Sequence, residues 1–296
     1  MSQEKRAVIV ASSVSFFLVC IKIFASIITG SMAILASAID SLLDMAMSLF
    51  NLFAVKKSEE EHDATYNYGQ GKIEAFAGMV EGSLISISAG VIMYLSIDKY
   101  INESEVVELE MSLGLMAFVT VVTGALVLYL TEASRKSHSL VLKADALHYK
   151  TDVYTNLGIF LSLGLIYFTG FGVIDQIVSF AIGGYILYSA FGILKESYYM
   201  LMDHALDPEL VEDIEKIIME KEEIEGFHFL RTRLSGKVHF VDFHMVFKDP
   251  HISLMQAHTI SDEVECAIGK RIGGENEVTI HLDPVDDSKS PHVCER

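Results

Sequence analysis

Long apolar runs separated by short polar segments fill the first two-thirds of the chain, and this pattern ends near residue 202. A helix needs about 20 mostly apolar residues to cross the hydrocarbon core of a bilayer. Six runs reach roughly this length, and we predict them as transmembrane helices: Ala7–Ile28, Ala33–Val55, Ile73–Ser96, Ser112–Leu130, Ala144–Phe168 and Ile174–Lys195. Residues 1–202 are therefore predicted to form a polytopic α-helical membrane domain.

The remaining chain is polar and has the pattern of a small α+β domain over residues 203–285. Pro208–Glu223 has helical periodicity, and Ser253 is a suitable N-cap for a second helix that runs to about Gly269. Alternating apolar residues predict three strands: Phe227–Leu234, Val238–Phe247 and Glu277–Leu282. One sheet covered by two helices is the expected arrangement, and residues 286–296 are expected to be a flexible tail.

The charged residues indicate which partners can be excluded and how the predicted helices are oriented in the membrane. The formal net charge of −18 argues against binding nucleic acid, because phosphates would be repelled. Short loops that carry Lys or Arg face the cytoplasm. Lys5 and Arg6, Lys56 and Lys57, and Arg135 and Lys136 all lie at the same side of the predicted bundle. Both termini are therefore expected in the cytoplasm, which in a bacterial cell means a multi-pass protein of the inner membrane.

Four ionisable residues interrupt the apolar runs in two pairs. Asp40 and Asp44 lie in the second span, and His148 and Asp152 lie in the fifth. Residues spaced i, i+4 share one face of a helix. A charged group inside a membrane helix costs at least about 2.5–3.5 kcal/mol on insertion scales, so such groups normally face a bundle interior and serve function. Three carboxylates and one imidazole suit a tetrahedral divalent ion. Asp145, near a helix end, fits an interfacial or salt-bridged aspartate.

These ligand types also predict a mechanism. A metal needs deprotonated carboxylates and a neutral imidazole, so metal and protons compete for one site. Histidine changes charge close to physiological pH. If the bundle alternates between inward-facing and outward-facing forms, a divalent metal leaves with one form and protons return with the other.

Histidines gather in the polar domain, where seven of the chain's eleven lie after residue 225. Strand alternation places His244 opposite an apolar face, and it places His281 and Asp283 on the face opposite Val278, Ile280 and Leu282. His228 lies in the first strand and His258 near the start of the second helix. We predict that these four histidines and Asp283 hold one or two metal ions, with the carboxylate as a bridge. Bound cations would also let two acidic domains approach each other.

The motifs together resemble the cation diffusion facilitator family, in its bacterial zinc and ferrous-iron efflux branch. They are Asp40 with Asp44, ADALHYKTD ending at Asp152, GQGKIEA, LMDHALD, GFHFLRTR, FHMVF, MQAHTISD and TIHLDP. The resemblance implies a homodimer with a ferredoxin-like cytoplasmic domain. It implies a transport site of Asp40, Asp44, His148 and Asp152, and a binuclear cytoplasmic site of His228, His244, His258, His281 and Asp283. It further implies that Lys72 and Asp203 pair in a charge interlock that holds the dimer.

Two positions bear on the metal. The family branch has a further site with Asp-x-x-His-x-x-x-His spacing after the second span, where this chain has Asp63, Tyr66 and Gln70. We therefore predict that this third site is absent or very weak, and neighbouring His62 has the wrong spacing to replace it. In the family that this chain resembles, the residue at the position of Asp40 varies with the metal that is transported. An aspartate at this position implies a transporter of the broader class, which accepts both iron and zinc.

The predicted function is a proton-coupled exporter of a divalent transition metal, zinc or ferrous iron, with cadmium, cobalt and manganese as further substrates. A membrane-tethered metal sensor that binds ions without moving them is an alternative that the tail alone permits. An intramembrane aspartyl protease is a third, but the chain lacks a GxGD signature. The protease would also leave the histidines of the tail unexplained, and the intramembrane quartet argues against the sensor.

Overall fold

The computed structural model describes residues 3–29, 32–60, 63–101, 112–169, 171 and 173–288. The chain divides into two compact units, Met1–Tyr198 and Tyr199–Arg296.

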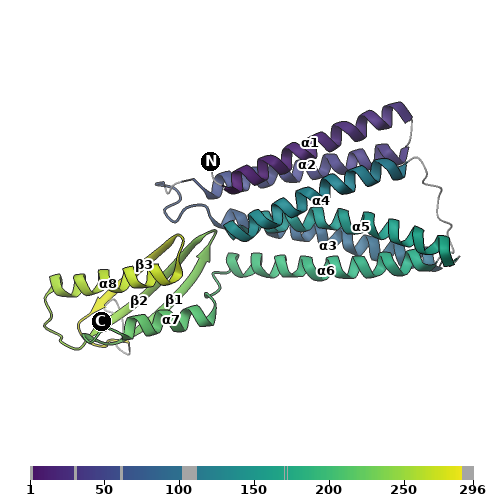
Figure 1. The fold of residues 1–296 in the computed structure, drawn as a ribbon. Coiled ribbons are helices and arrows are strands. Elements are labelled where there is room, and N and C mark those ends of the chain that lie inside the picture. Colours follow the sequence, from purple (N-terminus) through teal and green to yellow (C-terminus); the bar gives the residue numbers. More distant parts are fainter. Residues whose placement is uncertain are drawn as a thin grey trace. The chain divides into compact units, whose positions relative to one another are not determined.

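Six long helices make up the first unit and run alongside one another (Figure 1). Their order along the chain matches the six predicted apolar runs. Within the described residues, four of them contain a stretch long and apolar enough to cross a bilayer, namely Glu4–Ala25, Lys72–Ile101, Met116–Ser137 and Gln176–Leu201. The helices are α1 (Gln3–Thr29), α2 (Met32–Ser58), α3 (Lys72–Ile101), α4 (Ser112–Ser137), α5 (Leu140–Thr169) and α6 (Val173–Leu201).

The helices extend beyond the predicted apolar limits into polar sequence. Helix α2 continues through Lys56 and Lys57, and α4 continues through Arg135 and Lys136. Lysine and arginine are favourable in a last helical turn, because the free carbonyl groups there carry partial negative charge. The apolar pattern therefore identifies the part of each helix that can lie in the bilayer, and it predicts helices that are shorter than the observed ones.

Small residues contribute to the core of the first unit alongside larger apolar ones. Its buried cluster includes Ala7, Ala11, Ala54, Ala77 and Ala146. In a membrane, small side chains let helices approach closely, and van der Waals packing then holds them together. Helices α3 and α6 give the clearest case, because a Cβ atom added at Gly78 would lie 2.7 Å from Ser197 Oγ.

The second unit contains a three-stranded sheet and two helices. Helix α7 spans Pro208–Met219 and α8 spans Leu254–Ile272; the strands are β1 (Ile224–Ser235), β2 (Val238–Phe247) and β3 (Asn276–Asp283). Strand β2 is central, antiparallel to β1 and parallel to β3. The predicted order of helix, strand, strand, helix, strand is confirmed. Gly236, at a φ of 61°, makes the turn between β1 and β2.

One face of this sheet packs against both helices, as strand alternation predicts. Val241, Phe243, Met245 and Phe247 are buried in the same cluster as Ile214 of α7 and Val264 of α8. Ser253 is the N-cap of α8, and it forms a capping box with Gln256. The opposite face of the sheet is left for polar side chains, which include the histidines considered below.

Candidate metal sites

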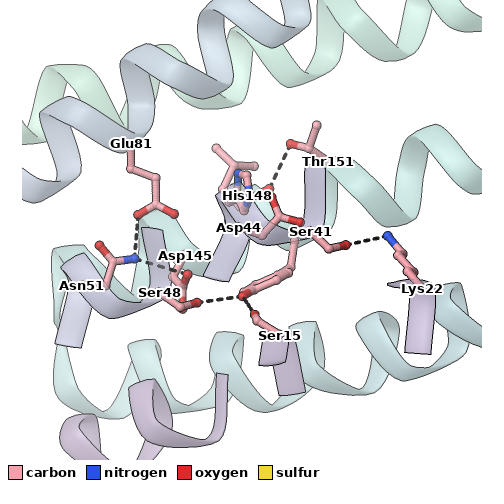
Figure 2. Close-up of polar contacts among 12 residues, drawn as sticks. Ser15, Lys22, Ser41, Asp44, Ser48, Asn51, Glu81, Asp145, His148 and Thr151 are labelled. Carbon is pink, nitrogen blue, oxygen red and sulfur yellow. Dashed lines mark hydrogen bonds and ion pairs between the residues drawn. The ribbon is translucent and has the colours of Figure 1, made fainter. Parts of the chain in front are cut away.

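Asp44 of α2 and the α5 residues His148 and Asp152 form a group of potential ligands inside the first unit. Their ligand atoms all lie within 4.8 Å of one another. His148 Nε2 is 2.9 Å from Asp44 Oδ1, and the two side chains are 21% and 15% exposed. The i, i+4 spacing of His148 and Asp152 puts both on the face of α5 that meets α2. Figure 2 shows His148 and Asp44 side by side.

Asp40, the fourth predicted ligand, has its backbone in α2, but its side chain lies outside the part of the structure that is described. Its position one helical turn from Asp44 gives it the same helix face. Its place in a ligand set stays a prediction.

Buried hydrogen bonds fix the helices around this group. The Tyr149 hydroxyl bonds to Ser15 of α1 and lies 2.8 Å from Ser48 Oγ of α2. Lys22 Nζ of α1 donates to Ser41 Oγ of α2 at 2.6 Å. These contacts join α1, α2 and α5 (Figure 2). The positions of Asp44 and His148 therefore depend on packing between three helices.

Asp145 does not lie at an interface with solvent, and the expectation of an interfacial or salt-bridged aspartate is wrong. It is 1% exposed, and its Oδ1 accepts a hydrogen bond of 3.2 Å from Asn51 Nδ2. The same Asn51 nitrogen donates to Glu81 Oε2 of α3 at 3.1 Å. Glu81 was not among the predicted site residues, although an acidic residue within the third apolar run was a visible signal.

The Asp44 group has the chemistry of a divalent metal site. Carboxylate oxygens and an imidazole nitrogen are ligands for zinc and for other first-row divalent ions. The hydrogen bond between His148 and Asp44 occupies two ligand atoms with one proton. A metal that binds both atoms must displace that proton from between them, so the metal and the proton compete for these two ligand atoms.

In the second unit, three histidines form a row across the sheet. His228 of β1 pairs in register with His244 of β2, and His244 pairs with His281 of β3. The ring centroids are 4.9 Å apart for the first pair and 4.4 Å for the second. The register of β1 shifts between His228 and Arg231, and Phe229 has a φ of 54° there. Such bulges often re-aim side chains beside functional sites.

Asp283 contacts all three histidines of this row. Its Oδ2 lies 2.9 Å from His244 Nδ1 and 3.3 Å from His228 Nε2, and its Oδ1 lies 3.2 Å from His281 Nε2. His228 Nε2 is buried and lacks a hydrogen bond within the described residues. A buried nitrogen without a hydrogen bond beside a carboxylate is what a metal ligand would leave without its ion. The residues therefore fit a metal ion.

The ligand group around Asp283 has a different membership from the predicted one. It consists of His228, His244, Asp283 and Asp287. Asp287 was assigned to a flexible tail, but its Oδ1 lies 3.6 Å from His228 Nε2. Two of the predicted ligands lie outside this group. His258 Nδ1 is 3.5 Å from Asp262, and His281 contacts Asp283 only through Oδ1, at 3.2 Å. An acidic pair one residue after TIHLDP was the available signal for Asp287.

The other two predictions concern the interlock and the loop after α2. Asp203 Oδ1 lies 3.2 Å from Arg233 Nη1 within its own unit, and Lys72 begins α3 in the other unit, so their pairing stays a prediction. In the loop, Asp63 Oδ1 accepts from the backbone N–H groups of Thr65 and Tyr66 at 2.7 and 2.6 Å. His62 lies outside the described residues.

Comparisons with known proteins agree over nearly the whole chain. A family model described as the cation efflux transmembrane domain matches residues 8–202, and one described as the cytoplasmic domain of the cation efflux protein matches residues 206–285. The cation-efflux pump FieF of Klebsiella pneumoniae subsp. pneumoniae is 38% identical over 279 residues, and that of Salmonella arizonae is 37% identical. Each alignment covers 94% of this chain and 92% of the relative.

The predicted fold class, a helical membrane domain followed by a cytoplasmic domain with a small mixed sheet, is thereby confirmed, and so is the assignment to a non-enzymatic efflux protein. The chain belongs to the cation efflux family and is a membrane transporter of divalent metal cations.

Proposed function

We propose that this protein exports zinc or ferrous iron from the cytoplasm in exchange for protons, by alternating access. Asp40, Asp44, His148 and Asp152 are proposed to hold the metal during transport. The observation that supports this most directly is the convergence of Asp44, His148 and Asp152 within 4.8 Å in the membrane domain. The similarity to FieF pumps supports efflux as the direction.

Exchange follows from the ligands themselves. The metal binds Asp44 only when the proton shared with His148 has left, and protonation of these groups from the opposite side of the membrane releases the metal. Because α2 and α5 both contribute ligands, a small relative movement of these helices changes the geometry of the whole site. We propose such a movement as the step between inward-facing and outward-facing forms.

The cytoplasmic domain is proposed to hold a permanently bound metal ion, and the protein is proposed to be a homodimer. His228, His244, His281 and Asp283 lie on the sheet, Asp287 contacts His228 from the chain after β3, and His258 is proposed to join them. Zinc is the proposed ion, because imidazole and carboxylate ligands suit it. A bound cation would neutralise carboxylates that otherwise repel across a dimer. Residues 1–202 and 203–285 are proposed as the two domains, with Lys72 and Asp203 as the interlock between protomers.

The proposed setting is the inner, or plasma, membrane of a bacterial cell, with both termini in the cytoplasm. Lys56 and Lys57 in the last turn of α2, and Arg135 and Lys136 in the last turn of α4, support this orientation.

The experiment is a flux assay with the full chain reconstituted into liposomes that contain a pH-sensitive dye. When zinc is added outside and enters the liposomes, protons should leave in exchange, so the dye should report a rise of the internal pH in step with zinc uptake. Asp152→Ala should abolish both fluxes while the protein still elutes as a folded dimer. Unchanged zinc flux in this variant would remove Asp152 from the site, and zinc flux without any proton flux would rule out antiport.

A further inference from the structure

Asn51, Glu81 and Asp145 form a second polar centre within the membrane domain, distinct from the Asp44 group. From this arrangement we infer that Glu81 and Asp145 bind a divalent cation at a separate station that the transported ion occupies before it reaches the Asp44 group. Asn51 positions the two carboxylates. This inference rests on the proposed function, since it assumes that the ion enters from the cytoplasm.

In each of the two carboxylates, of Glu81 and Asp145, one oxygen accepts a hydrogen bond and the other has no hydrogen-bond partner within the described residues. Asn51 Nδ2 donates to Glu81 Oε2 at 3.1 Å and to Asp145 Oδ1 at 3.2 Å. Glu81 Oε1 and Asp145 Oδ2 are buried and have no hydrogen-bond partner within the described residues. Figure 2 shows the two carboxylates meeting at the Asn51 amide. Carboxylates that bind metals are commonly oriented in this way, by a hydrogen bond to the oxygen that faces away from the ion.

Burial makes the two free oxygens significant. Glu81 and Asp145 are each 1% exposed, and Asn51 is fully buried. A buried polar atom without a partner costs about 1–3 kcal/mol, and such an atom in a native structure often marks an ion or water that the coordinates lack. Two carboxylates match the charge of one divalent cation, and a hydrated magnesium-like ion needs only one or two of them.

Another glutamate of the same helix provides the contrast. Glu74 is also 1% exposed. Its Oε1 accepts from Ser58 Oγ at 2.8 Å, and its Oε2 accepts from Ser139 Oγ at 3.1 Å. Both oxygens of Glu74 are therefore hydrogen-bonded, one by α2 and the other by the residue just before α5, so Glu74 has a structural explanation that Glu81 lacks.

The position of the station follows from the helices. Asn51 lies seven residues after Asp44 in α2, and Asp145 lies three residues before His148 in α5. At 1.5 Å per residue, these offsets place the station roughly 5–10 Å from the Asp44 group. The displacement is toward the end of α2 that carries Lys56 and Lys57, which the proposed orientation assigns to the cytoplasm. An ion that enters from that side meets Glu81 and Asp145 first.

The test counts Mn²⁺ bound to the full chain in nanodiscs, from the loss of the free-ion signal in electron paramagnetic resonance. Mn²⁺ suits carboxylate oxygens. Glu81→Gln and the matched control Glu74→Gln are each made in the natural chain and in an Asp44→Asn background. Asp145→Asn is the second variant of the station, which serves if Glu81→Gln does not elute as folded protein.

We expect Glu81→Gln to lose one Mn²⁺ per chain in both backgrounds, and Glu74→Gln to lose none. Unchanged Mn²⁺ binding in Glu81→Gln and Asp145→Asn would mean that these carboxylates hold protons only, which overturns the inference. Loss confined to the chain with Asp44 intact would assign the ion to the Asp44 group and also overturn it. Zinc flux of the Asp44→Asn variant tests the proposed function separately, because the Mn²⁺ count does not depend on transport.

Discussion

His148 Nε2 lies 2.9 Å from Asp44 Oδ1, and this contact joins residues that are 104 positions apart in the chain. It brings the only imidazole of the described intramembrane ligand group against a carboxylate from a different helix. In the proposed function, metal binding and proton binding therefore compete for the same pair of atoms.

Replacing the imidazole should change the metal preference. In His148→Asp the group becomes all-oxygen, so we expect the ratio of zinc to manganese transport to fall at least about ten-fold, because carboxylates favour manganese relative to imidazole. A competition assay with both ions in reconstituted liposomes measures this ratio. His138→Asp, outside the ligand group, is the control. An unchanged ratio in His148→Asp would show that His148 does not ligate the metal.

Tyr149 should stabilise the membrane domain without binding the ion. Its hydroxyl bonds to Ser15 and Ser48, which are 2% and 0% exposed. Tyr149→Phe leaves both serine hydroxyls without this partner, so we expect a loss of about 1–3 kcal/mol in the free energy of unfolding. Thermal unfolding of the full chain in detergent tests this.

The matched control for Tyr149 is Tyr188→Phe, because Tyr188 is 79% exposed. Equal melting temperatures for the two variants would contradict a structural role for the Tyr149 hydroxyl.

The sequence predicts the helices and strands well because each has a strong local signal. The alternation in β2 places His244 opposite Phe243 and Met245, and the structure agrees. The i, i+4 pairs likewise predict that His148 and Asp152 share a face, since this spacing follows from helix geometry alone.

The sequence could not predict the surroundings of Asp145 and Asp287, because these depend on which distant segments of the chain pack together. Asp145 looks interfacial when α5 is considered alone, but α2 and α3 bury it beside Asn51 and Glu81. Asp287 looks like part of a tail until the chain after β3 turns it toward His228. The wrong expectation for Asp145 arises because contacts between distant segments leave no periodic pattern in the sequence, and the contact between Asp287 and His228 is hidden for the same reason.

Asp287 should contribute to metal affinity in the cytoplasmic domain. Its carboxylate belongs to the ligand group of His228, His244 and Asp283. We expect Asp287→Asn to weaken zinc binding there by about ten-fold or more, within the range seen when groups that support a metal site are removed. Calorimetric zinc titration of the full chain measures the change.

Asp207→Asn is the matched control for Asp287→Asn, because Asp207 precedes α7 and its side chain makes no capping hydrogen bond. Equal zinc affinity in the natural chain and in Asp287→Asn would contradict the assignment.

Asp213 should make the stability of the cytoplasmic domain depend on pH. Hydrogen bonds from Arg271 and then Lys216 lower the pKa of Asp213 below its ordinary value of 3.8. The folded state therefore favours the carboxylate, and the stabilisation is present above that ordinary pKa and is lost as pH falls through the lower folded value. We expect Asp213→Asn to lower the melting temperature of this domain at pH 7 but not near pH 2. Asp249→Asn is the control, and a loss that persists at pH 2 would contradict the charge-based explanation.

Two substitutions in the loop after α2 should create a zinc site that the natural chain is predicted to lack. Asp63 uses Oδ1 for the backbone N–H groups of Tyr66 and Thr65, and these bonds lower its pKa, so it is ionised at neutral pH. What the predicted third site lacks is imidazole at positions 66 and 70. We expect Tyr66→His with Gln70→His to add one bound zinc per chain in equilibrium dialysis. Tyr68→His with Gln70→His adds the same two imidazoles at the wrong spacing and should add none. Equal gains in both double variants would mean that added histidine, and not the Asp63 spacing, captures the ion, and no gain in either would mean that this loop does not bring the three side chains together.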